Sequence, residues 1–278
     1  MPTINTNVAA IKARSSLDKV QRDMDTSIAR LSSGKRITRA HDDAAGQAIA
    51  GRMESQIRGL NMAVRNAKDG QSLVDSQEGA LQEVAGILQR MRELAVQAGS
   101  GVAQKTDREY LETEMEALVD EVAAVSANTK FNDTTILTGA QFSFYTDIDV
   151  AGTSIDVAGT KVRPQSLGPI TVAAISIGSG TTGAASVAGM ITKIDTAIGS
   201  IAAMRANLGA ISNRFNHVID NLTNVVANTE AAKSRVEDAD FAVETTQLTR
   251  NTVLQQAATS MVAQANAQKN SILALIQG

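Results

Sequence analysis

Apolar residues recur at alternating steps of three and four along the segment from Ile49 to Ala98. This spacing puts them on one side of an α-helix, so the segment predicts a single amphipathic helix of about 55 residues. Asp42 or Asp43 can cap its start, and Gly99 can end it. At about 1.5 Å per residue the helix is roughly 80 Å long, beyond the span of a small domain. We therefore expect it to pack lengthwise against other long helices.

Two further segments show the same spacing. Thr106 followed by Glu109 has the pattern of a capping box and predicts a second helix carrying apolar residues from Leu111 to Val125. The pattern returns from Ile191 to Val225 at alternating steps of three and four. These segments supply the neighbours that the first long helix needs.

The two ends of the chain carry narrow apolar stripes. One runs from Ile4 to Leu31 and stops at Gly34, which suits a left-handed helix cap, and the other runs from Leu254 to Leu275. Neither helix buries enough apolar surface alone, so we expect both to be largely disordered in a monomer and to fold on packing. The predicted polymerisation seam consists of Ile4, Val8, Ile11, Met24, Ile28, Leu31, Leu254, Met261, Ile272 and Leu275.

Partners for these stripes must come from other copies of the chain. The simplest arrangement puts the N- and C-terminal helices side by side as a coiled coil and stacks many such pairs. Each ~100 Å² of apolar stripe buried contributes roughly 2.5 kcal/mol before the ordering entropy is subtracted. Heterologous contacts that do not close into a ring produce helical filaments. The pattern therefore predicts a self-assembling protein.

The middle of the chain differs from both ends. Between Phe131 and Gly189 it is rich in glycine, and apolar residues alternate with a period of two at Phe142, Phe144, Ile148 and Val150. Further strand-like runs lie at 155–157 and 170–177, with Gly and Pro turns between them. We expect a small region of β-hairpins.

The predicted fold is mainly α, a long coiled-coil helical rod built from both termini with a small β-hairpin region in the middle. The pattern divides the chain into five segments, in which residues 1–43 and 236–278 form the coiled coil of the two ends, 44–140 and 190–235 form the helical bundle continuous with it, and 141–189 form the hairpin region.

Composition argues against an enzyme. The 278 residues include 3 Pro, no Cys and 2 His. The absence of cysteine excludes disulfides, thiolate catalysis and cysteine-bound metal, and two isolated histidines leave little for a triad or a metal site. Phosphate-binding loops are missing as well. We expect no catalytic residues, no metal and no cofactor.

Charge and hydropathy bear on the partners. The net charge is -3, with neither a basic arm nor an acidic tail, so a nucleic acid is not an expected partner. No run of about 18 apolar residues predicts a membrane span. Residues 1–14 also lack the apolar core of a cleaved signal peptide, so an extracellular protein of this sequence needs another export route.

Acidic residues offer two weak metal candidates. Asp42 and Asp43 open a helix, where adjacent aspartates usually cap the backbone and face the helix dipole. Asp147, Asp149 and Asp156 lie among glycines, but their spacing and the missing Glu do not match a calcium loop. Neither set predicts a metal site.

Ordered motifs give the sequence a resemblance to a known family. They cover roughly residues 1–140 and 190–278, while 141–189 correspond to the family's variable part. The sequence resembles a bacterial flagellin, a short form lacking the large outer domains. The matching motifs are Ile4 to Asn7, Arg30 to Gly34, Asp42 to Ala50, Arg65 to Ala67, Glu78 to Leu81, Arg92 to Gln97, Leu208 to Ala210, Asn213 to Phe215, Ser234 to Asp240 and Gln264 to Asn266.

This resemblance implies a structural subunit of the flagellar filament that polymerises beneath a cap protein and serves motility. It implies a secreted protein, exported unfolded through the flagellar type III channel and located in the extracellular filament. It further implies a hook-filament junction protein as a neighbour and an export chaperone on the C-terminal helix. Among the segments, it implies that 1–43 and 236–278 are an inner coiled-coil domain, 44–140 and 190–235 a rod domain, and 141–189 a variable part.

The segment from Leu88 to Gln97 resembles the part of flagellins that a vertebrate Toll-like receptor senses. The positions that match the family's motif are Arg90, Leu94 and Glu114, and we expect them to form one exposed patch for receptor recognition and subunit contact. Arginine-centred patches are frequent in interfaces. The alternative interpretation is an ordinary charged helix face.

Two other functions fit parts of the pattern. A hook-filament junction protein shares the terminal helices but forms one short ring. A chemotaxis-receptor-type signalling coiled coil shares the lack of Pro and Cys, but its hairpin tip falls near the middle of the chain, where this sequence is rich in glycine. The Asp42 to Ala50 motif favours flagellin over both.

Overall fold

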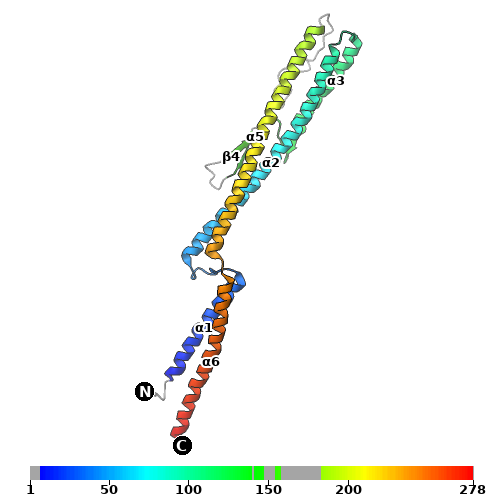
Figure 1. Cartoon of the computed structure of the whole chain (residues 1–278). Helices are drawn as coiled ribbons and strands as arrows, with labels where there is room; N and C mark the ends of the chain where they lie inside the picture. The colour runs from blue at the N-terminus through cyan, green and yellow to red at the C-terminus, as the bar shows by residue number, and fades with distance from the viewer. Residues whose placement is uncertain (1–6, 140, 147–153, 158–182, 278) are drawn as a thin grey trace. The chain divides into compact units, whose positions relative to one another are not determined.

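The structure is a computed structural model that describes residues 7–139, 141–146, 154–157 and 183–277. Most of these residues are helical, which confirms the mainly α class (Figure 1). The chain divides into two compact units: unit 1 comprises residues 1–57 and 227–278, and unit 2 comprises residues 58–226. The elements are α1 (Val8–Ser33), α2 (Ala44–Ala98), α3 (Lys105–Asn128), β1 (Lys130–Phe131), β2 (Thr134–Thr135), β3 (Phe142–Tyr145), β4 (Ser154–Val157), α5 (Gly183–Glu237) and α6 (Phe241–Gln277).

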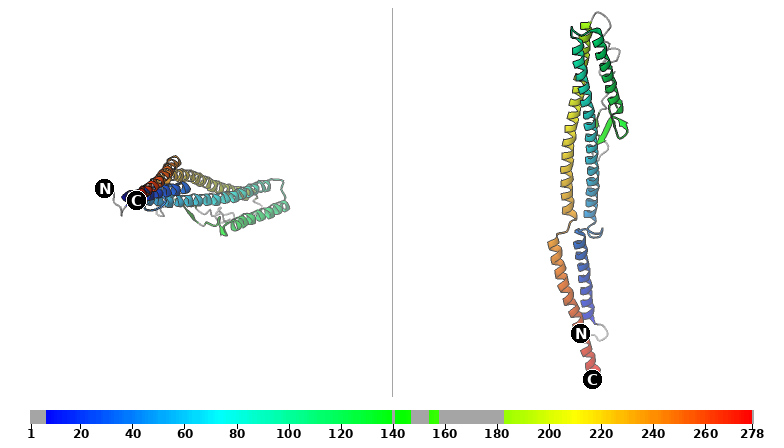
Figure 2. Two further views of the ribbon diagram at one scale, coloured as in Figure 1. Left: turned by 90° about the horizontal axis from the view of Figure 1, so that it is seen from below. Right: turned by 90° about the vertical axis from the view of Figure 1, so that its right-hand side faces the viewer.

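In unit 1, α1 and α6 lie side by side and run antiparallel (Figures 1 and 2). Asn7 caps α1 by accepting a hydrogen bond from the Ala10 amide at 3.0 Å. The helix ends at Gly34, whose φ of 70° is left-handed, as the sequence predicts. The predicted pairing of the N- and C-terminal helices is therefore observed within one chain.

The α1–α2 and α5–α6 connections of unit 1 are bonded to each other. The Arg36 amide donates to the Glu237 carbonyl at 2.7 Å, and the Ala239 amide donates to the Gly34 carbonyl at 3.0 Å. Lys35 also pairs with the Glu237 carboxylate at 2.5 Å. These bonds satisfy backbone groups that the ends of the helices leave open.

The helix of about 55 residues predicted from the sequence is α2, which has 55 residues. Its first turn is capped by Asp43, whose Oδ1 accepts a hydrogen bond from the Gly46 amide at 2.8 Å. The capping box predicted for α3 at Thr106 and Glu109 is wrong. The box consists of Gln104 and Asp107, because α3 begins at Lys105.

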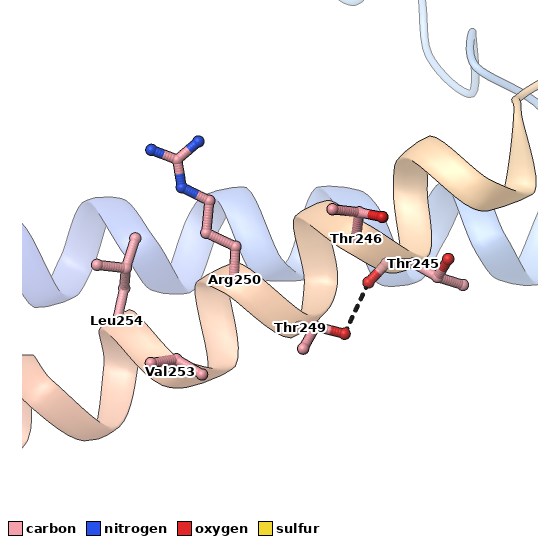
Figure 3. Close-up of a pocket in the computed structure, with 6 residues that line it drawn as sticks. All are labelled: Thr245, Thr246, Thr249, Arg250, Val253 and Leu254. Atoms are coloured by element: carbon pink, nitrogen blue, oxygen red, sulfur yellow. Dashed lines mark hydrogen bonds between the residues drawn. The ribbon is translucent and has the colours of Figure 1, made fainter.

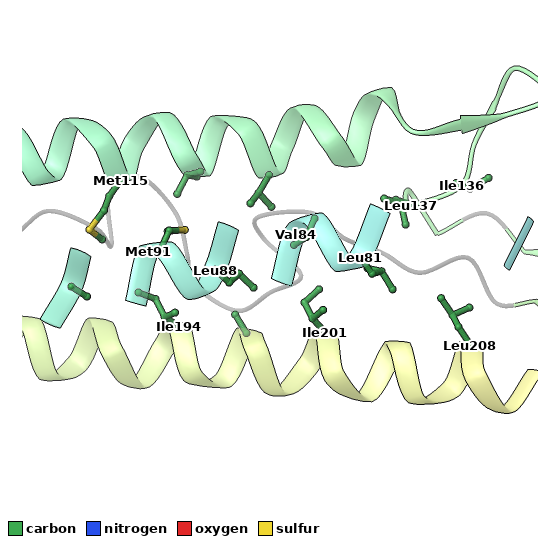
Figure 4. Close-up of a cluster of buried hydrophobic side chains, with 14 of the residues drawn as sticks. Leu81, Val84, Leu88, Met91, Met115, Ile136, Leu137, Ile194, Ile201 and Leu208 are labelled. Carbon is green, nitrogen blue, oxygen red and sulfur yellow. The ribbon is translucent and has the colours of Figure 1, made fainter. Parts of the chain in front are cut away.

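Unit 2 is built around one hydrophobic cluster between α2, α3 and α5. Leu81, Leu88 and Met91 of α2 meet Met115 of α3 and residues of α5 that are equally buried (Figure 4). The α5 members, from Met190 to Phe215, follow steps of three, four and seven, as the apolar spacing requires. The fully buried large side chains are Leu73, Leu81, Leu88, Met91, Leu94, Met115, Ile136, Leu137, Ile194, Ile201 and Phe215.

Two small antiparallel sheets complete the described part of unit 2. β1 and β2 are joined by Asn132 and Asp133, whose positive φ values of 48° and 59° suit a tight hairpin turn. β3 pairs with β4. The alternation at Phe142 and Phe144 falls on β3 and the predicted run at 155–157 falls on β4, while 170–177, Ile148 and Val150 lie outside the described residues.

The β3–β4 hairpin is anchored by an aromatic contact. Phe144 meets Phe215 of α5 edge-on, with 5.9 Å between the ring centroids. Both rings lie over Gly70 of α2, where a Cβ atom placed on that glycine would come within 2.5 Å of Phe215. Asn66 adds a hydrogen bond to the Tyr145 carbonyl at 3.2 Å.

Helix α5 contains a window with a mean hydropathy of 1.3, apolar enough by length and composition to cross a membrane. The search for uninterrupted apolar runs did not identify it, because glycine, threonine and charged residues interrupt the runs while alanine and the larger apolar residues keep the average high. Met190, Ile194 and Ile201 of this helix pack in the unit 2 cluster. A core helix of a water-exposed protein passes the same test.

Candidate assembly interface

The contact between α1 and α6 is narrow and unusually polar. Most of the half-buried and buried positions follow heptad steps on both helices. On α1 they are Ala10, Ala13, Leu17, Val20, Met24, Ser27 and Leu31, and on α6 they are Glu244, Leu248, Asn251, Gln255, Ala258, Val262 and Ala265. Small and polar side chains outnumber large apolar ones. We call this contact the inner seam.

Three polar contacts cross the inner seam at different heights. Near the N-terminus, Asn7 donates to the Ala265 carbonyl at 3.1 Å, and midway Gln255 donates to Gln21 at 2.6 Å. Near the connections, Arg30 pairs with Glu244 at 2.9 Å, and the Glu244 side chain is only 9% exposed. Buried polar groups of this kind fix the register of a coiled coil.

Large apolar side chains on the other sides of α1 and α6 are exposed to solvent. Val8 is 51% exposed and Ile11 is 58% exposed on α1, while Val253 is 60% exposed and Met261 is 61% exposed on α6. An exposed apolar side chain by itself is ordinary, but a series of them along two adjoining helices is typical of an interaction surface. Each of the two helices therefore carries an uncovered apolar face in addition to the inner seam, and we call these two faces together the uncovered surface.

The predicted seam residues fall into three groups. Val8, Ile11, Ile28, Leu254 and Met261 lie on the uncovered surface. Met24 and Leu31 lie half-buried in the inner seam. Ile4 is outside the described residues, and the side chains of Ile272 and Leu275 are outside them too. More of the residues chosen by apolar spacing therefore lie on the uncovered surface than in the inner seam between α1 and α6.

Two of the three residues of the predicted recognition patch meet on the surface of unit 2. Arg90 of α2 donates to Glu114 of α3 at 2.8 Å, and it also pairs with Glu93 at 3.2 Å. The hydrogen bonds that Arg90 donates to Glu114 and to Glu93 raise the pKa of Arg90 above its ordinary value. The guanidinium is half-exposed and stays charged.

The third residue lies elsewhere. Leu94 is 1% exposed and belongs to the unit 2 hydrophobic cluster, so the expected placement of Leu94 beside Arg90 on an open face is wrong. The reason is the packing of both α3 and α5 against α2. Two neighbours widen the buried stripe of α2, and Leu94 falls within it together with Met91 and Ala95.

The two aspartates before α2 act as caps. Asp43 holds the first turn of the helix, and Asp42 Oδ2 accepts hydrogen bonds from the Arg39 amide at 2.9 Å and from Thr38 Oγ1 at 2.9 Å. The bond from the Arg39 amide, followed by that from Thr38, lowers the pKa of the Asp42 carboxyl. This geometry uses both carboxylates for the protein's own backbone and polar groups.

Sequence reasoning missed the polar pairs of the inner seam. Ser27, Asn251 and Gln255 occupy heptad positions of the inner seam, and Gln21 directly follows one of them, which is the signal that was available in the sequence. A search for apolar residues alone passes over them. It also passes over Arg250, which lies on the uncovered surface of α6 between exposed apolar residues.

Comparisons with known proteins agree with this geometry at both ends of the chain. The family model of the bacterial flagellin N-terminal helical region matches residues 4–141, and that of the bacterial flagellin C-terminal helical region matches residues 191–276. The chain belongs to the bacterial flagellin family. Flagellin of Halalkalibacterium halodurans is 38% identical over 275 residues, with 99% of each chain covered.

Another flagellin of similar length supports the assignment. Flagellin of Bacillus subtilis is 36% identical over 302 residues, again with 99% of each chain covered. A solved structure of a putative flagellar hook-associated protein from Vibrio parahaemolyticus has a TM-score of 0.63 at 14% identity and covers 71% of this chain and 100% of that one. At that identity it supports the fold of this flagellin-family chain and nothing more.

Proposed function

We propose that this chain is the structural subunit of a bacterial flagellar filament and that the uncovered surface of α1 and α6 makes contacts between subunits. The observation that carries the proposal is the series of exposed apolar residues beside a complete inner seam, including Ile11, Leu254 and Met261. Because α1 and α6 cover each other only along the inner seam, their exposed apolar faces are available for contacts with another chain. Membership of the flagellin family supplies the kind of assembly.

The terminal helices fold fully during assembly in this proposal. The inner seam buries few large apolar side chains, and an isolated helix pair of that kind is marginal in water. Covering the exposed side chains adds roughly 25 cal/mol for each Å² of apolar surface removed from water. Residues 1–43 and 236–278 then form the inner coiled-coil domain, with 44–140 and 190–235 in the rod domain and 141–189 as the variable part.

The exposed Arg90–Glu114 pair is proposed as the centre of the surface recognised by a flagellin-sensing Toll-like receptor and by a neighbouring subunit. Its guanidinium and carboxylates are accessible, and arginine is enriched among residues that dominate binding. Leu94 contributes from beneath by holding α2 against α3 and α5.

The remaining partners follow from the flagellin family. We propose a filament cap protein, a hook-filament junction protein and an export chaperone that holds the C-terminal helix before export. The chain functions as a structural protein rather than an enzyme, in the extracellular filament, without a cofactor and without binding nucleic acid or membrane. The export route without a cleaved signal peptide stays a prediction.

Electron microscopy of the purified full chain after seeding or salt-induced assembly tests the function, alongside circular dichroism before and after. We expect long filaments and a gain in helical signal. A helical chain that forms only short rings would move the assignment to a junction protein, and one that never associates would exclude a filament subunit.

A pair of matched variants tests the surface. Leu254→Asp puts a charge on the uncovered surface of α6, whereas Val102→Asp puts one on a side chain that is 88% exposed in the α2–α3 connection of unit 2. We expect Leu254→Asp to stop elongation and Val102→Asp to leave it near normal. Equal elongation by both variants would contradict the role of α6.

A further inference from the structure

The outward face of α6 carries a shallow, open groove (Figure 3). Two rows of side chains border it, each advancing by four residues along the helix. One row is Thr245, Thr249 and Val253, and the other is Thr246, Arg250 and Leu254. Grooves between rows of this spacing accept the side-chain ridge of a second helix.

The second row of the groove belongs to a longer heptad series on α6. Val243, Arg250, Leu254 and Met261 follow steps of seven, four and seven, and the three apolar members are between 42% and 61% exposed. Within the described part of the chain, Arg250 makes no hydrogen bond or ion pair. A helix with two heptad series is suited to packing against two neighbours, and α1 is only one of them.

A complementary series runs along α1. Ile11, Asp18, Asp25 and Ile28 follow steps of seven, seven and three, so two carboxylates lie between two exposed isoleucines. Arg14 and Gln21 occupy the intermediate positions. Asp18 has no partner among the described residues, and Asp25 accepts only a long bond from Gln21 at 3.3 Å. The two carboxylates of this series are opposite in charge to the guanidinium of Arg250 and can pair with it.

The two series lie on opposite sides of the α1·α6 pair. At about 100° per residue, each series is turned roughly 100° away from the inner seam of its own helix. The α1 series follows the seam positions by one residue and the α6 series precedes them by one residue, so the two turns have opposite senses. Because α1 and α6 run antiparallel, opposite turns place the two series on opposite sides of the pair. The two series therefore cannot meet within a chain, but they can meet between chains.

We infer that the α6 groove receives the Ile11–Ile28 face of α1 from a second copy of this chain, with Arg250 paired to Asp18 and Asp25. The inference rests on the proposed filament function. Copies in a helical assembly point the same way along the axis, so α6 of one copy and α1 of the next meet antiparallel. A contact between two different faces repeats without closing, as filament growth requires.

Charge reversal in the full chain tests the pairing. We expect Arg250→Glu to raise the critical concentration for elongation at least about tenfold, since close charge pairs in interfaces contribute that much or more. We expect the double variant with Asp18→Arg and Asp25→Arg to raise the critical concentration by a similar factor. Adding both aspartate reversals to Arg250→Glu restores assembly to within about threefold of the original chain, because every subunit then carries both altered faces.

Lys19→Glu is the control, since it reverses one exposed charge on α1 outside the series. A loss as large as that of Arg250→Glu would show that net charge alone matters and would overturn the pairing. A normal critical concentration for Arg250→Glu would overturn it as well. If the unaltered chain forms no filaments, the proposed function fails instead, and the two failures are distinguishable.

The lack of cysteine allows a direct second measurement. Arg250→Cys combined with Asp25→Cys or Asp18→Cys should give disulfide-linked ladders of chains in oxidised filaments. Filaments without such ladders, or a disulfide formed only within single chains, would contradict the contact even where charge reversal affects folding.

Discussion

Two glycines in α2 should respond in opposite directions to the same change, replacement by alanine. Gly79 faces open space, with nothing within 4 Å of the position that a Cβ would take. At Gly70, a Cβ would meet Phe215 Cζ at 2.5 Å, Phe215 Cε1 at 2.9 Å and Phe144 Cδ2 at 3.1 Å. Both residues lie inside the helix, so their intrinsic helix propensities are the same.

The magnitudes follow from two opposing effects. Alanine stabilises a helix interior relative to glycine by about 0.5–1 kcal/mol, which is the whole effect expected for Gly79→Ala. Gly70→Ala gains the same amount but forces Phe215, which is fully buried, to move. Overpacking costs typically 1–3 kcal/mol, and the edge contact with Phe144 is worth about 0.5–1.5 kcal/mol more. We expect a net destabilisation of about 2 kcal/mol, within a range of about 0.5–4 kcal/mol.

Thermal unfolding of the full chain, followed by circular dichroism, measures the difference. For a unit of this size about 1 kcal/mol shifts the midpoint by roughly 2–4 °C. Gly79→Ala should therefore unfold a few degrees above the original chain and Gly70→Ala a few degrees below it. Equal shifts, or a rise for Gly70→Ala, would refute the packing of the hairpin anchor over α2.

Three further changes test the site. Leu94→Ala removes a fully buried side chain and should destabilise unit 2 by about 2–5 kcal/mol, whereas Arg90→Ala changes the unfolding midpoint much less and instead lowers receptor signalling. Signalling lost in Leu94→Ala at unchanged stability would put Leu94 on the surface. Arg30→Met leaves Glu244 buried without its cation and should lower the temperature of filament disassembly more than the double change with Glu244→Met does; equal loss in both would argue against the pair. The pKa of Asp42 is lowered by its hydrogen bonds, so its contribution is present above the ordinary carboxyl pKa and is lost as the pH falls through the lowered value; Asp42→Asn should remove this acid sensitivity from amide exchange at Thr38.

Much of the fold was predictable because apolar residues recur with helical spacing along the long helices. The start and end of α2 follow from Asp43 and Gly99, and the end of α1 follows from Gly34, whose backbone conformation other residues resist. The α3 cap was misplaced because Gln104 and Asp107 offer the same side-chain chemistry two residues earlier. Local sequence alone does not decide between two such caps.

The site was harder to predict, since burial depends on how many neighbours a helix has. Leu94 and Met91 lie on adjoining sides of α2, and only the presence of both α3 and α5 makes both of them core residues. The same limitation applied to the inner seam, where Gln255 and Asn251 carry the contact that an apolar pattern assigns to larger residues. Which face of a helix is buried and which is exposed therefore depends on how the helices pack, and the apolar pattern of one helix does not decide it.

The three polar contacts of the inner seam together fix the register in which α1 and α6 pair. If α6 slips by one heptad along α1, every contact moves by about 10 Å, so Asn7, Gln255 and Arg30 lose their partners at once. The small apolar residues lose little in the same slip, because alanines pack almost equally well in either alignment. We therefore expect that a subunit whose α1 and α6 pair out of register at the end of a filament is weakly held and that its helix pair separates again. A subunit with the correct register stays bound. Polarity that makes the helix pair weak also lets errors be corrected before the next subunit covers them.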